Sequence, residues 1–248
     1  MVVERFCAED EGTLSLVLSS SEDGGSPICE LLGSASLVCA FSRNLEARLL
    51  GPGQVASERG TSEQDEDEDL LFFDGLPAAS LEMQSLGDAA SWRRILAELH
   101  NTPLSKLQGL VSSPPLWIRE LRLLCLCAPS VADVRIMAGE SLEQAWEFRC
   151  SGECLCAASP FFAAALGESP WIEGKSRELC MWGEDARAWQ SMLLHMHNWP
   201  QGIGTGAGKD DGEHEEVYSL VRLLALCKKY LVDNQEKEVL GRLRDSQS

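Results

Sequence analysis

The chain has 248 residues, of which 44% are hydrophobic and 24% are charged, a balance typical of a folded globular protein with one large domain or two of ordinary size. Its formal net charge of -18 at pH 7 repels nucleic-acid phosphates and anionic membrane surfaces, and no apolar run approaches the roughly 20 residues that cross a bilayer. We therefore expect neither a nucleic-acid partner nor a membrane partner.

Residues 1–6 read MVVERF and are followed by acidic residues, without the basic start and long apolar stretch of a secretory signal. We expect a protein of the cytoplasm or the nucleus. In those reducing compartments the ten cysteines should remain thiols, and most of them lie in apolar runs, where cysteine behaves as a small hydrophobic residue. The sequence therefore predicts no disulfide framework.

Three segments of the first half recur in the same order in the second half, which predicts an internal repeat. Each pair shares the spacing of its small, apolar or aromatic residues, and the pairs are 37–49 with 154–166, 92–103 with 189–200, and 122–127 with 222–227. The second pair shares the pattern Trp-x7-His-Asn-x-Pro. The alternative is chance similarity between helices that are rich in leucine and alanine.

Two insertions lie between the repeated segments. Residues 57–69 contain an acidic run at 63–69, and residues 201–216 are rich in glycine and acidic residues. Such compositions are typical of solvated loops. We predict two units, at 1–129 and 130–248, each with one of these loops.

Alternation of apolar residues at 134–137 and 146–149 predicts two strands that form a hairpin around a turn at 138–141. The elements that follow, in chain order, are a helix over 155–166 that ends near Gly167, a strand over 179–182, a helix capped by Asp185 that ends before Pro200, a helix over 217–231 and a short helix over 239–243. The helix after Asp185 carries Trp189, Met192, Leu193 and Met196 on one face. This order predicts an α+β fold.

Four segments of the second half resemble a known family. They are Asp133-Val134-Arg135-Ile136, Trp146-Glu147-Phe148-Arg149, Leu155-Cys156-Ala157-Ala158-Ser159-Pro160-Phe161-Phe162, and Leu223-Leu224-Ala225-Leu226-Cys227-Lys228-Lys229-Tyr230-Leu231. On these segments residues 133 to 243 resemble the BTB/POZ domain. The resemblance implies two tandem BTB/POZ-like units, each a small β-sheet covered by a cluster of α-helices, with the first unit degenerate.

The sequence departs from the family pattern at two places. Where the family usually has His-Lys after its second strand, this chain has Ser151 and Gly152, so what those two residues contribute to a partner groove does not carry over. The first half keeps a serine at Ser42 but continues with Arg43-Asn44-Leu45 in place of Pro160-Phe161-Phe162.

The sequence argues against three kinds of chemical site. The glycine-rich run at 202–209 lacks the residues of a phosphate loop, because Ile203 and Asp210 stand where Gly and Ser or Thr are required. No Cys-x-x-Cys pair occurs, and His195 and His197 are two residues apart on a predicted helix and point to different faces, which argues against a zinc site with Cys150, Cys154 and Cys156. Cysteines in apolar helices are poor nucleophiles. We predict no cofactor and no metal.

The resemblance implies a protein-protein interaction module and not an enzyme: it implies self-association, pairing with another BTB domain, or an adaptor role with cullin-type ubiquitin ligases. Trp171-Ile172-Glu173 resembles the hydrophobic-x-Glu signature with which family members bind cullin. An equally good interpretation is that these residues belong to a loop that covers the core. With Phe161 and Phe162, these are the candidate partner-binding residues. We expect a monomeric pseudo-dimer or a homodimer; the alternative function is an enzyme with a site assembled from Cys, His and carboxylate side chains.

Overall fold

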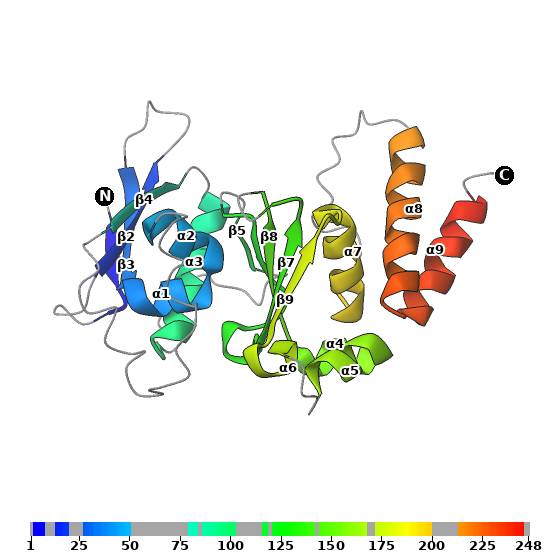
Figure 1. The fold of residues 1–248 in the computed structure, drawn as a ribbon. Coiled ribbons are helices and arrows are strands. Elements are labelled where there is room, and N and C mark those ends of the chain that lie inside the picture. The colour runs from blue at the N-terminus through cyan, green and yellow to red at the C-terminus, as the bar shows by residue number, and fades with distance from the viewer. Residues whose placement is uncertain are drawn as a thin grey trace. The chain divides into compact units, whose positions relative to one another are not determined.

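A computed structural model gives the fold of the protein (Figure 1). The structure describes residues 2–7, 13–19, 27–50, 79–83, 86–102, 116–118, 121–141, 144–167, 172–199 and 213–245. The fold combines helices with two mixed β-sheets, so the predicted α+β class is confirmed. The chain divides into two compact units, residues 1–113 with 117–123, and residues 114–116 with 124–248.

The sheet of the first unit has the strand order β1-β3-β2-β4. Its strands are β1 (Val2–Arg5), β2 (Thr13–Ser19), β3 (Pro27–Ser34) and β4 (Ala79–Met83). Strands β2 and β3 are antiparallel, whereas β4 runs parallel to β2. Leu14, Leu16 and Leu31 are completely buried, as expected for the face of a sheet that is covered by helices.

Three helices of the first unit lie on one side of this sheet (Figure 1). They are α1 (Ala35–Phe41), α2 (Arg43–Leu50) and α3 (Leu86–Leu99). Trp92, Ile95 and Leu96 recur on one face of α3 at the spacing of a helix, and none of the three side chains is exposed. Helix α3 therefore supplies Trp92, the largest fully buried side chain among the described residues of this unit.

The five-stranded sheet, whose strands β7, β8 and β9 belong to the second unit, has the strand order β5-β6-β8-β7-β9. Its strands are β5 (Leu116–Ile118), β6 (Leu123–Cys125), β7 (Val134–Gly139), β8 (Trp146–Cys150) and β9 (Glu178–Trp182). Between β6 and β7, a 3-10 turn spans Pro129–Val131. Strands β7 and β8 form the predicted antiparallel hairpin, which pairs Ile136 with Phe148. The predicted strand at 179–182 is β9, an edge strand that runs parallel to β7.

The single helix predicted over 155–166 is wrong. Two helices occupy this region, α4 (Gly152–Ala158) and α5 (Pro160–Leu166), and the break falls at Ser159. Proline disfavours a helical conformation in the residue before it and has no N–H to continue the helix. Ser159 is accordingly extended, with φ of -148° and ψ of 124°, and its side chain accepts a hydrogen bond from Phe162 N.

Four more helices follow in the second unit, and α6 (Ile172–Ser176) was not predicted. Helix α7 (Ala186–Met196) was predicted correctly: Asp185 caps it by accepting hydrogen bonds from Arg187 N and Ala188 N at 2.9 Å, and Trp189, Met192, Leu193 and Met196 are buried. The other two are α8 (Glu213–Lys229) and α9 (Asp233–Asp245). Helix α7 lies beside the sheet, and α8 and α9 pack outside it (Figure 1).

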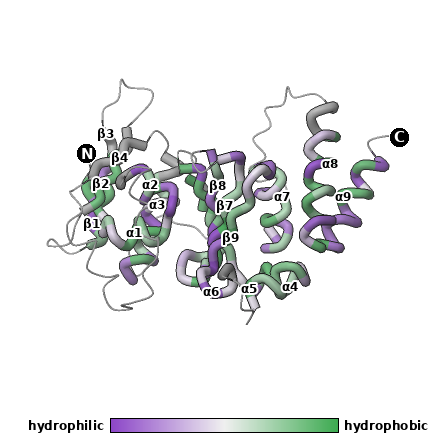
Figure 2. Tube along the Cα trace, in the orientation of Figure 1, coloured by the Kyte–Doolittle hydropathy of each residue, from purple (hydrophilic) through white to green (hydrophobic). Residues whose placement is uncertain are grey.

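Both C-terminal helices differ from their predicted limits. Helix α8 starts at Glu213, so residues 213–216, predicted as the end of a loop, are helical. Helix α9 extends well beyond the predicted range of 239–243. The prediction was too short because most residues of α9 are hydrophilic and give no apolar pattern, in contrast to the mostly hydrophobic α4 (Figure 2). The acidic side chains of Asp233 and Glu236 lie in the first turn of α9, where the helix dipole favours negative charge.

The two units share one order of elements. Each unit has a strand hairpin, two consecutive helices, a strand parallel to the first and then a longer helix. These elements are β2-β3-α1-α2-β4-α3 in one unit and β7-β8-α4-α5-β9-α7 in the other, where the short helix α6 is added before β9. The first two pairs of repeated segments fall on equivalent elements of this order. The third pairing is wrong, because residues 123–125 form strand β6 whereas 222–227 lie in helix α8.

The acidic run at 63–69 and the glycine-rich run at 202–209 lie outside the described residues, as do Pro103, Trp171 and Pro200. Among the helices that the structure does describe, none has the combination of length and apolar composition needed to span a membrane.

Replacing Ser159 by alanine tests the helix break. The Ser159 side chain is completely buried, caps α5 and donates a hydrogen bond to the carbonyl oxygen of Tyr230 at the end of α8. We expect Ser159→Ala to lower the free energy of unfolding by about 2–3 kcal/mol, from the lost cap and a buried carbonyl left without its donor. Urea unfolding followed by tryptophan fluorescence measures the change. The control is Ser219→Ala on the exposed face of α8, and equal effects of the two variants would contradict this role of Ser159.

Candidate interaction surface

The sequence-predicted site residues lie on two short neighbouring helices of the second unit. Phe161 and Phe162 are in α5, and the backbone of Ile172 and Glu173 forms the first turn of α6. Helices α5 and α6 are in contact. Trp171 lies outside the described residues. The described part of the candidate site is therefore a helix pair and not an extended loop.

Phe161 and Phe162 belong to an aromatic cluster that joins α5 to α7 and α8. The Phe161 ring lies edge-on to Tyr230 with centroids 5.0 Å apart, and the Phe162 ring stacks on Tyr230 at 6.0 Å and lies edge-on to Trp189 at 6.3 Å. Phe162 has no exposed surface and Phe161 is half-buried. As a correction to the sequence prediction, Phe162 serves the core, and only Phe161 has surface to offer to a partner.

Tyr230 is the centre of this cluster. Its hydroxyl donates a hydrogen bond of 2.8 Å to Glu184, and Trp189 Nε1 donates another of 2.6 Å to the same carboxylate. Burial, followed by the hydrogen bond to Glu184, raises the pKa of Tyr230 to about 12. Lys229 forms an ion pair with Glu184. These contacts hold the end of α8 against α7 and the turn after β9, and they leave the hydroxyl of Tyr230 protonated at neutral pH.

His197 fixes the start of α4. Its Nε2 accepts a hydrogen bond of 3.1 Å from Ser151 N, and its Nδ1 lies 2.8 Å from the Leu193 carbonyl oxygen. Since Nε2 accepts, the proton is on Nδ1 and the ring is neutral. Burial lowers the pKa of His197, and the hydrogen bond to Leu193 offsets part of this effect. His197 therefore acts as an acceptor for a backbone N–H at the point where β8 passes into α4.

The first unit contains the same arrangement. His100 Nε2 accepts from Ser34 N at 3.0 Å, and His100 Nδ1 lies 2.9 Å from the Leu96 carbonyl oxygen. Ser34 is the N-cap residue of α1 as Ser151 is of α4. We call this pair of hydrogen bonds the histidine clip. Both histidines directly follow the last residue of a helix, α3 or α7. The shared His-Asn pattern was visible in the sequence, but the contact with a distant backbone N–H was not predicted.

Each clip is followed by the same turn. Asn101 and Asn198 have φ of 51° and 55°, in the left-handed region that asparagine tolerates better than most residues. Beyond them, Thr102 N donates to the Ala97 carbonyl oxygen and Trp199 N donates to the Leu194 carbonyl oxygen, which closes the ends of α3 and α7. The shared His-Asn sequence therefore encodes a helix end together with the clip.

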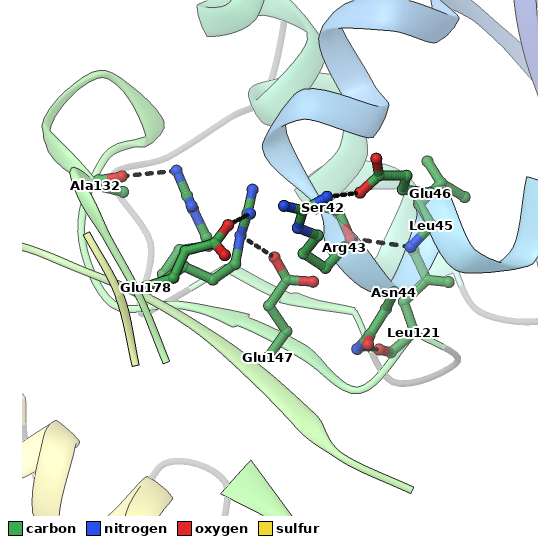
Figure 3. Close-up of polar contacts among 11 residues, drawn as sticks. Ser42, Arg43, Asn44, Leu45, Glu46, Leu121, Ala132, Glu147 and Glu178 are labelled. Carbon is green, nitrogen blue, oxygen red and sulfur yellow. Dashed lines mark hydrogen bonds and ion pairs between the residues drawn. The ribbon is translucent and has the colours of Figure 1, made fainter. Parts of the chain in front are cut away.

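The sheet of the second unit carries a buried ionic cluster that the sequence analysis missed. Arg135 of β7 forms ion pairs with Glu147 of β8, at 3.3 Å, and with Glu178 of β9 (Figure 3). Glu147 is completely buried and Arg135 is 7% exposed. The signal was present as charged residues that alternate with apolar ones along β7 and β8. Removing one member of such a cluster leaves the others buried without compensation.

In the first unit, Ser42 occupies the place of Ser159. It separates α1 from α2 with φ of -124° and ψ of 114°, and its Oγ accepts a hydrogen bond of 3.3 Å from Leu45 N (Figure 3). Arg43 pairs with Glu46, and the Asn44 side chain donates to the Leu121 carbonyl oxygen (Figure 3). The first unit thus keeps the serine break but fills the positions of Phe161 and Phe162 with Asn44 and Leu45.

The environment of the cysteines bears on the enzymatic alternative. Burial raises the pKa of the Cys39 thiol to about 11 and that of Cys227 to about 12, and it raises the pKa of Cys150 well above its usual value. A thiol with such a pKa is protonated at neutral pH and is a poor nucleophile. Within the described ranges, no group of three or more His, Cys, Asp or Glu side chains is placed to hold a metal ion.

Several large apolar side chains of the second unit are exposed. They are Val131, Trp182, Tyr218, Val221 and Leu231, each 46–54% exposed. Tyr218 and Val221 lie one turn apart on α8, and Leu231 follows the end of that helix. Exposed apolar side chains that recur on one helix are suited to contact another polypeptide.

No protein-family model matches this chain, and no curated protein matches it.

The pH dependence of stability tests the histidine clip. Because the folded-state pKa of His197 lies below its usual value of 6.5, the unfolded state takes up a proton more readily, so stability is full above about pH 6.5 and falls as the pH drops below it. A glutamine in place of His197 can accept the same hydrogen bond without titrating. We expect wild type to lose about 1 kcal/mol more than His197→Gln between pH 7.5 and 5, measured by urea unfolding. His195→Gln is the control, and parallel curves for wild type and His197→Gln would exclude the clip as the cause.

Proposed function

We propose that this chain is a protein-protein interaction module, a BTB/POZ-type scaffold or adaptor, and not an enzyme. The observation that carries the proposal is the structural role of the residues that resemble the family. Ser159 and Pro160 break the helix pair, Phe162 enters the core, and Phe161 stays half-buried against Tyr230. The segment thus leaves one aromatic side chain partly exposed at the edge of a helical cluster.

Two further observations support a binding role. Exposed apolar residues on α8 and after it provide surface area for another polypeptide. Cys39, Cys150 and Cys227, whose thiol pKa values burial raises, are buried, which suits structural residues and not a catalytic thiolate. The implied partners are other proteins, such as another BTB domain or a cullin-type scaffold.

We further propose that the two units form a pseudo-dimer within one chain. The support is their common order of strands and helices and the histidine clip in each. A chain that already contains both copies needs no second chain to complete the pair. Light scattering coupled to size exclusion at micromolar concentration should give the mass of one chain. A stable dimer at that concentration would refute the proposal in favour of a homodimer.

A cullin-type partner is the finer form of the proposal, and Glu173 tests it. Glu173 lies in the first turn of α6, adjacent to α5, and its charge would be part of the hydrophobic-x-Glu contact. We expect Glu173→Lys to abolish the capture of purified cullin N-terminal domain by the full chain, because reversal of an interfacial charge costs several kcal/mol. Surface-immobilised cullin and a titration of the chain measure this.

The matched control is Lys175→Glu, which reverses an exposed charge on the same short helix. It should bind as wild type does if the contact is specific to Glu173. Equal binding by wild type and Glu173→Lys, or none by wild type, would remove the cullin form of the proposal while leaving a scaffold for other proteins. Circular dichroism of both variants checks that the fold is kept.

A further inference from the structure

The protein has two tyrosines, and their environments are opposite. Tyr230 is 3% exposed and its hydroxyl is bound to Glu184, whereas Tyr218 on α8 is 54% exposed. A modifying enzyme that acts on a phenolic oxygen can therefore reach Tyr218 and not Tyr230 in the folded protein. Tyr230 provides an internal control on the same helical segment.

The hydroxyl of Tyr218 lies next to a guanidinium group. Arg222 Nη2 donates a hydrogen bond of 2.9 Å to Tyr218 Oη, and the guanidinium carbon lies 4.3 Å from the centre of the ring. The other terminal nitrogen of Arg222 pairs with Asp185, the residue that caps α7. Arg222 therefore links Tyr218 to Asp185, and a new anion on Tyr218 Oη would compete with Asp185 for it.

The residues before Tyr218 are acidic and lie at a helix end. Glu213, Glu215 and Glu216 precede it in the first turn of α8. Among the side chains that the structure describes at the start of α8, Val217 is half-buried, Tyr218 and Ser219 are exposed, and Leu220 is buried. Helix ends open locally at low cost in free energy, which lets an enzyme bind this turn in an extended form.

We propose that Tyr218 is a phosphorylation site for an ATP-dependent protein tyrosine kinase with a basic substrate groove, and that the phosphate takes Arg222 from Asp185. In this transfer the bond between the γ-phosphorus of ATP and its bridging oxygen breaks, and a bond forms between that phosphorus and Tyr218 Oη. ADP leaves, and the phenolic proton passes to the catalytic base of the kinase.

The phosphate changes the connection between α7 and α8. It carries a charge of about -2 and three acceptor oxygens, and a phosphate binds a guanidinium group more strongly than a single carboxylate does. Once Arg222 turns to the phosphate, Asp185 keeps its hydrogen bonds to Arg187 N and Ala188 N but loses the ion pair that holds α8. The modification thus acts on the helices next to the exposed apolar residues of α8.

The site is tested on the full chain with ATP and a tyrosine kinase catalytic domain that accepts the acidic copolymer of Glu and Tyr. Mass spectrometry should find about one phosphate per chain, on Tyr218, with loss of this phosphate in Tyr218→Phe and no loss in Tyr230→Phe. A peptide of residues 209–222 tests the kinase without the fold. The site is overturned if the full chain stays unmodified, whether or not the peptide is modified. It is also overturned if the phosphate is found mainly on Tyr230.

The switch of Arg222 is tested by the effect of Asp185→Asn in both forms of the chain. Asparagine still caps a helix but cannot form the ion pair. In the unmodified chain the substitution should lower the melting temperature, and in the phosphorylated chain the drop should be smaller, because Arg222 is already bound by phosphate. Equal drops in the two forms would overturn the switch and leave only the site.

Discussion

The second unit depends on the break at Ser159, which separates the two short helices α4 and α5. At Ser159 one buried hydroxyl serves both the next helix, by accepting from Phe162 N, and a distant one, by donating to the Tyr230 carbonyl oxygen. The turn this forces places Phe162 under Trp189 and Tyr230 and leaves Phe161 at the edge. The position of Phe161 at the edge, the aromatic cluster in the core and the end of α8 are therefore set by the same residue.

Elements with a clear apolar period were predictable from the sequence. The hairpin at 134–150, the edge strand and helix α7 with its Asp185 cap were all found because alternation, or a spacing of three and four, marks a buried face. The helix break was missed because the composition of 155–166 is uniformly helical, and the proline in the middle of the run was given too little weight against it. Helix α9 was cut short because only Gln235 and Val239 of its residues are buried.

Long-range polar contacts were beyond sequence reasoning. The clip depends on His197 meeting Ser151, and the ionic cluster depends on β7 lying between β8 and β9, so neither is visible before the topology is known. The matched His-Asn pairs did signal that these positions matter, and the repeat was read correctly there. It was read wrongly at 122–127, where similarity between leucine-rich runs hid the difference between a strand and a helix.

The two clips close chain segments of unequal length. His197 and Ser151 are 46 residues apart, whereas His100 and Ser34 are 66 apart, and the extra chain includes the acidic insertion. Since the entropy of closing a flexible segment grows only with the logarithm of its length, the longer closure costs about 0.3 kcal/mol more. A large acidic insertion can therefore accumulate inside the first unit at almost no thermodynamic expense, provided that it enters between the elements that the clip brings together.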